Sequence, residues 1–278
     1  MRETKKRLPD DWQSTLNQLG KTVEEKGKNA VIQFPLWPEA KRGTPNSFLR
    51  SALFSAIQSK DRRWLEDEVL YSQKGITIKF RGQQLNQEDL TLWETLVHLA
   101  RQHPLGNECF FTAHHILKAL GSKSQGGENH KRLHSGIMRL AGGLVQVTHE
   151  DKTYFGPLID GGLKDEVTNH YKIWLNRNLI RLYGDTQWTA IDWDQRQALK
   201  RKPLAQALHA YYSSHREPYP VKIETLRQLT GSRNKQTASF KRQIKTAYDA
   251  LKNTGFLDDY KIDGNVVKVQ RTPVLSYE

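Results

Sequence analysis

The order of predicted elements indicates an α+β fold built from two tandem winged-helix domains, each a group of helices followed by a two-stranded hairpin. Amphipathic helical patterns end at glycines that can close a helix, and alternating strand patterns flank short turns. The same order occurs once in each half of the chain. At 278 residues, the chain has room for two domains of ordinary size.

Three regions follow from composition. Residues 1–44 are predicted to form a flexible N-terminal arm, because they are charged and end in the proline-rich FPLWPEAKRGTP. Residues 45–160 are assigned to the first winged-helix domain and residues 165–278 to the second. The boundary is placed at Gly161-Gly162 and the charged LKDE that follows.

The first domain is expected to begin with a helix over residues 46–59, followed by a hairpin in KGITIKFRGQQL that turns at Arg81-Gly82. Asn86 is predicted to cap the next helix, and Thr112 to cap the helix that follows the short strand CFF. A basic helix in ENHKRLHSGIMRLAGG then leads to a hairpin of LVQVTH and KTYFGPL. The result is a helical group with a two-stranded wing.

The second domain repeats this order without evident sequence identity. YKIWLN and TQWTAI have strand patterns, and the helical DWDQRQALKRKPLAQALHAYYSS is expected to bend at Pro203. A Pro-Tyr-Pro corner precedes the short helix KIETLRQLTG, which Gly231 ends, and the long basic helix NKQTASFKRQIKTAYDALKNTG. FLDDYKI and NVVKVQR form the last hairpin, with its turn at Asp263-Gly264.

Charge favours a polyanionic partner. Lys and Arg total 43 against 30 Asp and Glu, for a net charge of +13, and residues 196–252 contain 13 basic and three acidic residues. Double-stranded DNA is the leading candidate. An acidic membrane is the weaker alternative, since no helix pairs its basic face with an apolar anchor face. A solvated surface that only maintains solubility is the third possibility.

The long basic helix supplies the candidate DNA-binding residues of the second domain. At 100° per residue, Phe240, Ile244 and Leu251 fall on one arc, which is expected to pack inward. The opposite arc is small and basic, so it can approach a groove, and the hairpin that follows can grip the backbone. The predicted DNA-binding residues of this domain are Arg233, Lys235, Ser239, Lys241, Arg242, Lys245, Lys268 and Arg271. The alternative is an amphipathic surface helix with a solvated basic face.

In the first domain, Lys131 and Arg132 lie on the outer face of a less basic helix. This face is expected either to bind DNA or to contact a partner protein, and the sequence does not decide between the two.

Catalysis finds little support in the sequence, and no metal or other cofactor is expected. The single cysteine, Cys109, excludes a Cys-based zinc cage. His130 and His134 have a metal-ligating spacing but no third ligand, and no phosphate-binding GxxxxGK[ST] loop occurs. Tyr211 and Tyr212, the candidate nucleophiles of a relaxase, lie in a helix expected to be structural. With no signal-peptide pattern and no apolar run of about 20 residues, a cytoplasmic location is expected.

Two blocks resemble a known family. SSHREPYPVKIETLRQLTGS, residues 213–232, is similar to the signature of TrfA-type plasmid replication initiators, and WPEAKRGTPNSFLRSALFSA, residues 37–56, resembles a second block of that family. The resemblance implies tandem winged helices that bind directly repeated origin sites, called iterons, and help to melt the adjacent A·T-rich duplex. It also implies recruitment of the host helicase DnaB and of DnaA, and exchange between monomer and homodimer with restraint of copy number. A transcriptional repressor that binds an operator without opening DNA is the alternative.

Family members can carry a sliding-clamp motif of the form QLSLF before the WP block. Here the matching stretch is QFPLWP, in which Gln33, Leu36 and Trp37 are the candidate clamp-binding residues and Phe34-Pro35 departs from the pattern. The alternative is a strap that packs on the first domain.

Overall fold

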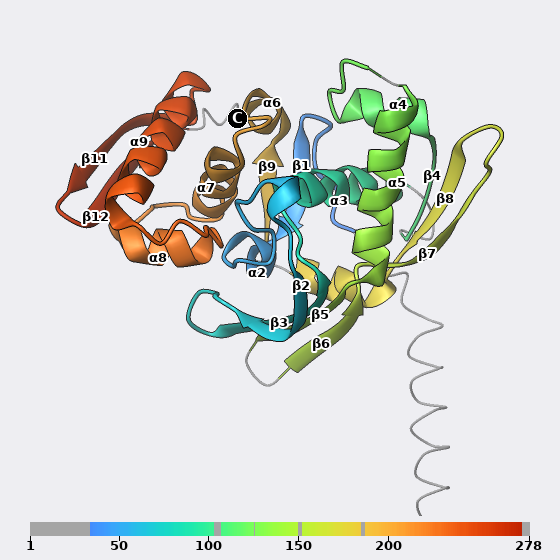
Figure 1. The fold of residues 1–278 in the computed structure, drawn as a ribbon, viewed down its shortest axis with the longest axis horizontal. Coiled ribbons are helices and arrows are strands. Elements are labelled where there is room, and N and C mark those ends of the chain that lie inside the picture. Colours follow the sequence, from blue (N-terminus) through green and yellow to red (C-terminus); the bar gives the residue numbers. More distant parts are fainter. Residues whose placement is uncertain (1–33, 103–106, 125, 150–151, 185–186, 274–278) are drawn as a thin grey trace, which may run out of the picture.

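The computed structural model describes residues 34–102, 107–124, 126–149, 152–184 and 187–273. The described chain has two hydrophobic cores, one formed almost entirely by residues 34–191 and the other by residues 199–267. We call residues 34–192 the N-terminal unit and residues 199–273 the C-terminal unit. Helix α6 (Trp193–Ala198) joins them, and the two units lie side by side (Figure 1).

The N-terminal unit contains three antiparallel sheets. Four strands pair in the order β2-β3-β5-β6, three pair in the order β4-β8-β7, and β1 pairs with β9. The strands are β1 (Lys41–Pro45), β2 (Trp64–Leu70), β3 (Ile76–Gln83), β4 (Glu108–Thr112), β5 (Leu144–His149), β6 (Lys152–Pro157), β7 (Ile159–Lys164), β8 (His170–Leu175) and β9 (Trp188–Asp192).

The helices of this unit pack between the sheets. They are α2 (Asn46–Leu49), α3 (Gln87–Ala100), α4 (Ala113–Ala119) and α5 (Gly127–Gly142), with 3₁₀ turns η1 (Ser59–Asp61) and η2 (Arg177–Tyr183). Asn86 caps α3 in a reciprocal box with Asp89, and Thr112 caps α4, so both predicted caps are confirmed. Trp93 at the centre of α3 is fully buried.

The C-terminal unit consists of α7 (Pro203–Ser213), α8 (Ile223–Leu229), α9 (Thr237–Asn253) and a three-stranded sheet. The sheet has the order β10-β12-β11, with β10 (Val221–Lys222), β11 (Leu257–Asp263) and β12 (Val266–Arg271). The predicted bend at Pro203 is a full break, because α6 ends at Ala198 and Pro203 starts α7 as its first residue. The final hairpin is confirmed, but its turn is Gly264-Asn265, one residue later than the predicted Asp263-Gly264, because Asp263 pairs with Val266.

Two predicted elements of the first half are wrong. The helix expected over residues 46–59 stops at Leu49, because Ala52 donates its backbone N–H to Tyr71 and Ser55 donates to Leu85, as a strap laid along the sheet would. The turn expected at Arg81-Gly82 is absent, since both residues lie inside β3 and pair with β2 and β5. A partner strand distant in sequence decides this register, so local alternation cannot reveal it.

The predicted boundary and arm also need correction. Gly161 and Gly162 lie within β7, which pairs with β8, so the N-terminal unit continues to Asp192 rather than ending near residue 160. Within the predicted arm, Phe34 and Trp37 are buried in the core and β1 pairs with β9. Residues 1–33 lie outside the described part of the chain.

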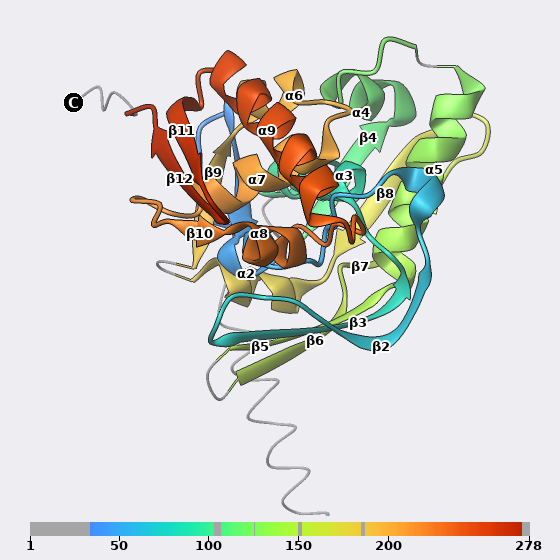
Figure 2. The same ribbon diagram turned by 60° about the vertical axis from the view of Figure 1, so that its left-hand side comes forward.

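Contacts between the units are specific and partly buried. Arg196 in α6 places its Nε 2.7 Å from Glu94 Oε2 in α3, and both side chains are fully buried. The backbone N–H of Ala56 donates to Thr230 at 2.6 Å, and Arg50 donates from Nε to the Ser214 hydroxyl at 3.0 Å. Figure 2 shows α8 and α9 in front of the N-terminal unit. Residues 50–56 are thus bonded both to the end of α7, at Ser214, and to the turn that precedes α9, at Thr230.

Candidate nucleic-acid interface

Helix α9 separates an apolar face from a basic one, as predicted. Phe240, Ile244 and Leu251 are fully buried, and Tyr248 joins them, donating or accepting a 2.8 Å hydrogen bond with the Tyr212 hydroxyl. Arg242 and Lys245 are exposed on the other side. The packing of the first face therefore fixes which side chains the helix presents outward.

Three of the four α9 cations have no acidic partner in the described part of the chain: Lys241 is half-buried, and Arg242 and Lys245 are exposed. Lys241, Arg242 and Lys245 form no ion pair with any residue that the structure describes. The acidic Asp249 of the same helix accepts a hydrogen bond from the Tyr260 hydroxyl at 2.7 Å. Unpaired cations beside small residues leave the full positive charge available to an anionic groove.

Three of the predicted residues lie in the turn before α9 or in the first turn of α9, and each has a different environment. Helix α9 starts at Thr237 rather than at Asn234, so Lys235 lies in the turn, where it is exposed. Asn234 Nδ2 donates to the Ser239 hydroxyl at 2.9 Å, which fixes Ser239 beside the helix start. Arg233 donates to Gln84 Oε1 at 3.2 Å, so it contacts the N-terminal unit.

The β11–β12 hairpin contains two residues predicted to contact DNA, and their environments differ. Lys268 is exposed on β12. Arg271 is directed inward: its Nη1 donates to the carbonyl of His215 at 3.0 Å and its guanidinium lies 4.9 Å from the Phe256 ring centre. Burial lowers the pKa of Arg271. Arg271 is thus a packing residue, and its predicted role at DNA is wrong.

Sequence reasoning missed Lys261 on the same hairpin. The strand register places Lys261 directly opposite Lys268, and both are exposed. Like charges directly opposite each other are destabilising in a hairpin unless an anion lies between or above them. The sequence signal that could have identified Lys261 is the hairpin pattern. The turn lies one residue later than predicted, and only with that turn does Lys261 pair with Lys268.

Helix α5 of the N-terminal unit uses its cations differently. Leu133, Ile137 and Leu140 are buried, as predicted, and Lys131 is exposed. Arg132 is exposed but its Nη2 lies 3.5 Å from Glu88 Oε1, and Arg139 Nη2 lies 2.9 Å from Asp89 Oδ1.

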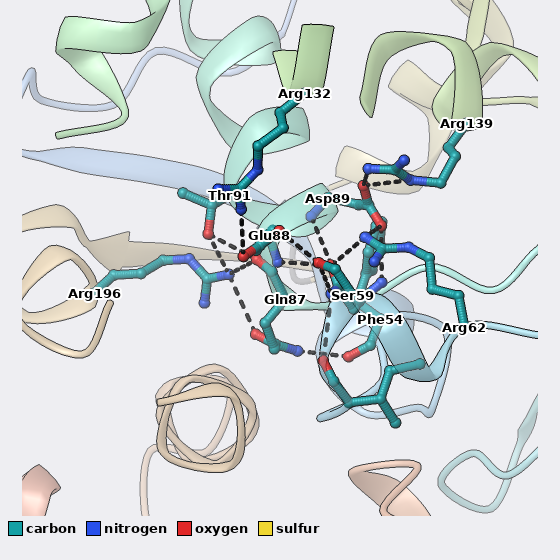
Figure 3. A network of polar contacts seen from close by, with 12 residues as sticks. Phe54, Ser59, Arg62, Gln87, Glu88, Asp89, Thr91, Arg132, Arg139 and Arg196 are labelled. Atoms are coloured by element: carbon teal, nitrogen blue, oxygen red, sulfur yellow. Dashed lines mark hydrogen bonds and ion pairs between the residues drawn. The ribbon is translucent and has the colours of Figure 1, made fainter. Parts of the chain in front are cut away.

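Asp89 is the centre of this polar network, which Figure 3 shows between the start of α3 and the end of α5. Its carboxylate is 1% exposed and receives Arg62 at 2.7 Å on one oxygen and Arg139 on the other. It also closes the capping box with Asn86. Burial lowers the pKa of Arg62, while Asp89 opposes that shift. The network orders the start of α3 and leaves Lys131 as the α5 cation without an ion pair among the described residues.

The candidate clamp-binding residues are divided. Leu36 is 78% exposed, whereas Trp37 is buried and donates from Nε1 to His98 Nδ1 at 3.0 Å. Trp37 also stacks on Tyr183 with a ring-centre distance of 6.1 Å. The alternative of a strap packed on the first domain therefore describes residues 34–37, and Trp37 is not available to a clamp. Gln33 lies outside the described residues.

Other candidate chemistry can be located as well. In the described ranges, no cluster of three or more His, Cys, Asp or Glu side chains could hold a metal ion. His134 Nδ1 lies 3.4 Å from the Tyr171 hydroxyl. None of the helices described has the length and apolar character needed to span a membrane.

Comparison with known proteins places the chain in a family. The family model described as TrfA protein matches residues 3–271. The plasmid replication initiator protein TrfA of Escherichia coli is 26% identical over 246 residues, which cover 84% of this chain and 63% of that protein. RepFIB replication protein A of Escherichia coli is 22% identical over 201 residues, covering 69% of this chain and 62% of that protein. The chain thus spans slightly less than two thirds of the length of these relatives.

A solved structure shares the fold. Domains 2 and 3 of RctB align with a TM-score of 0.56 at 13% identity, covering 83% of this chain and 99% of that one. Since the family model matches nearly the whole chain, this protein belongs to the TrfA family of plasmid replication initiators.

Proposed function

We propose that this protein initiates plasmid replication by binding directly repeated iteron sites in double-stranded origin DNA. Family membership and the basic face of α9 support this role, and the second of these is the observation that carries it. The proposed role contains no enzymatic step. Binding energy alone supplies the work done on DNA.

In the proposed complex, each unit acts as a winged helix. Helix α9 follows α8 after a turn, and the β11–β12 hairpin follows α9, which is the order of helix-turn-helix and wing. Arg242 and Lys245 enter the major groove, where an arginine can bind a guanine edge or a phosphate. Lys261 and Lys268 approach the flanking backbone.

Helix α5 and the β5–β6 hairpin form the corresponding pair in the N-terminal unit. Lys131 contacts a phosphate of the same site, and the internal ion pairs of Arg132 and Arg139 reduce the contribution of α5. This assigns most of the affinity to the C-terminal unit. It also places both units on one side of a site whose halves are separated by about one helical turn, roughly 10–10.5 bp.

Opening of an adjacent A·T-rich duplex follows in the proposal from binding several repeats. Bending each site costs on the order of 1–6 kcal/mol, which protein–DNA contacts offset. Recruitment of the host helicase DnaB and of DnaA, and exchange between monomer and homodimer, complete the proposed role in the bacterial cytoplasm.

Fluorescence anisotropy with a duplex that carries the direct repeats of the cognate origin tests the DNA-binding part. If about six phosphates are neutralised, the logarithm of the affinity falls against the logarithm of salt concentration with a slope of about −5. A slope near zero contradicts the electrostatic interface. A scrambled duplex of the same length is the control for sequence preference.

Permanganate footprinting on supercoiled origin DNA tests the opening part. An initiator exposes reactive thymines in the A·T-rich tract, whereas a transcriptional repressor binds and leaves every thymine protected. Binding without reactive thymines would therefore replace the proposed role with repression.

A further inference from the structure

A cavity of about 470 Å³ lies between the two units, apart from the outer face of α9. Its wall is formed by α3, the α4–α5 turn and the inner side of α5 on one side, and by α6, the α6–α7 turn and Gln206 of α7 on the other. Cavities of this size are typical of sites for small organic ligands.

One part of the wall is apolar and another is cationic. Leu92, Leu117, Leu120 and Leu133 form the apolar part. The cations come from three separate segments: Lys123 from the α4–α5 turn, Arg132 and Arg139 from α5, and Lys200 and Arg201 from the α6–α7 turn. Figure 3 shows Arg132 reaching from its helix toward Glu88 at the start of α3. The wall thus combines an apolar surface with a group of cations, most of them exposed, which we call the mouth of the cavity.

The cations at the mouth are only partly compensated: Glu88 and Asp89, which also line the cavity, pair with Arg132 and Arg139. Lys200 donates from Nζ to the carbonyls of Leu120 and Gly121, both at 2.7 Å. Its pKa is lowered by burial and by the nearby charges of Arg201 and Arg132. Lys123, Lys200 and Arg201 form no ion pair within the described ranges. An anion at this point would relieve the mutual repulsion.

Two amides line the same cavity. Gln206 is only 6% exposed, and its side chain lies in the cavity wall. Gln197 Nε2 is buried and has no hydrogen-bond partner among the described residues. A buried amide without a partner costs about 1–3 kcal/mol, so such groups usually serve a ligand or water.

We propose that this cavity binds a nucleotide, with the base against the leucines, its polar edge on Gln206 and Gln197, and its phosphates on Arg201, Lys200 and Arg132. An amide presents both a donor and an acceptor, as the edge of a purine requires. One guanidinium group can donate two parallel hydrogen bonds to two oxygens of a phosphate. The bound nucleotide touches both units, so it links the position of α5 to that of α6 and α7.

Fluorescence titration of the full chain with N-methylanthraniloyl-ADP tests this site, in the absence of DNA. Arg201→Gln removes an exposed cation of the mouth and is expected to weaken binding at least tenfold, as loss of a charged hydrogen bond does. Gln206→Leu keeps the side-chain volume and is expected to weaken it to a similar extent. Thermal unfolding checks that both variants fold.

Arg242→Gln is the matched control, because it removes an exposed cation from the outer face of α9. Binding that stays within twofold of the original in this variant supports the cavity. An equal loss in Arg242→Gln and Arg201→Gln overturns the proposal, because the probe then binds the DNA-facing surface. No binding to the unaltered chain, or unchanged binding in Arg201→Gln, also overturns it.

Competition separates a nucleotide from a simple phosphate site. ATP is expected to displace the probe at a concentration at least tenfold lower than tripolyphosphate does. Equal competition by the two overturns the assignment of the leucine wall and the amides to a base. DNA affinity, measured separately, reports on the proposed initiator role, so the two ideas fail independently.

Discussion

Helices α5 and α9 each precede a β-hairpin in their own unit, yet they use their cations in opposite ways. In α5, Arg139 neutralises the buried Asp89 and Arg132 pairs with Glu88. In α9, Lys241, Arg242 and Lys245 form no ion pair with described residues. A count of Lys and Arg, three in α5 and four in α9, does not reveal this difference. The contacts indicate that the arginines of α5 form ion pairs within the protein, whereas these three cations of α9 do not.

The largest expected effect concerns the joint between the two units. Arg196→Ala leaves Glu94 fully buried without its countercharge and is expected to lower the free energy of unfolding by about 3–5 kcal/mol. Burial raises the pKa of Glu94 and lowers that of Arg196, which shows that burial disfavours the charged form of each side chain. Each charge therefore depends on the other for its stabilisation.

Urea denaturation followed by tryptophan fluorescence measures this loss. The double variant Glu94→Gln/Arg196→Met is the control and should recover much of the stability, because no lone charge remains. If the single variant is as stable as the original, the ion pair does not hold the units together.

Acid is expected to act on one histidine in each unit. Burial lowers the pKa of His98 to about 4 and that of His209 to about 3, from 6.5. Trp37 donates to His98 Nδ1, which leaves that nitrogen no room for a proton. The unfolded chain binds more protons in this window, so stability is full above pH 6.5 and falls toward pH 4.

At pH 5 each histidine is expected to cost about 2 kcal/mol relative to pH 7. The measurement is the urea midpoint across pH 4.5–7.5, for the original chain and for His98→Gln and His209→Gln. Each variant should show a flatter profile. A profile in which one variant changes nothing would assign the acid response to the other unit alone.

The third prediction compares the two helices at DNA. Arg242→Ala is expected to lower affinity for the cognate repeat by about 1–3 kcal/mol, and to relax the preference at one base pair if it reads a guanine. Arg132→Ala is expected to cost less than about 0.5 kcal/mol, because its charge is shared with Glu88. Anisotropy titrations at one salt concentration give both values, and equal losses would remove the distinction between the helices.

The smallest effect is expected on the hairpin. Lys261→Gln and Lys268→Gln should each reduce the steepness of the salt dependence by about 0.9, with little change in sequence preference. Lys222→Gln, another exposed lysine of the C-terminal unit, is the control. An unchanged slope in both hairpin variants would place the wing away from the DNA.

Much of the C-terminal unit could be predicted because its elements are local. The periodicity of Phe240, Ile244 and Leu251, the glycine at 231 and the hairpin turn all act within a few residues of one another. The strands of the N-terminal unit are harder to predict from the sequence. Its β3 pairs with β5 more than 60 residues later, so Arg81-Gly82 looked like a turn. Arg271 and Trp37 were misassigned for a similar reason, since the groups that bury them come from distant segments.

The network around Asp89 shows what a sequence conceals at a candidate site. Arg62, Asp89 and Arg139 are far apart in the chain, and the packing of η1 and α5 against the start of α3 brings them together. A pattern of charges along one helix gives its outer face but not the carboxylate that another element supplies. Gln206 and the cavity it lines have no counterpart in any sequence motif.

The hydrogen bond from Ala56 to Thr230 has a consequence for the choice of DNA sites. Gly231, with a φ of +60°, follows directly, and a Cβ there would lie 2.4 Å from the Ser55 hydroxyl oxygen. The backbone of the N-terminal unit therefore packs against the α8–α9 turn, which sets the direction of α9 in the C-terminal unit. In the proposed complex, residues 51–56 would therefore set the distance between the two units, so lengthening or shortening them is expected to change the repeat spacing that a single molecule accepts.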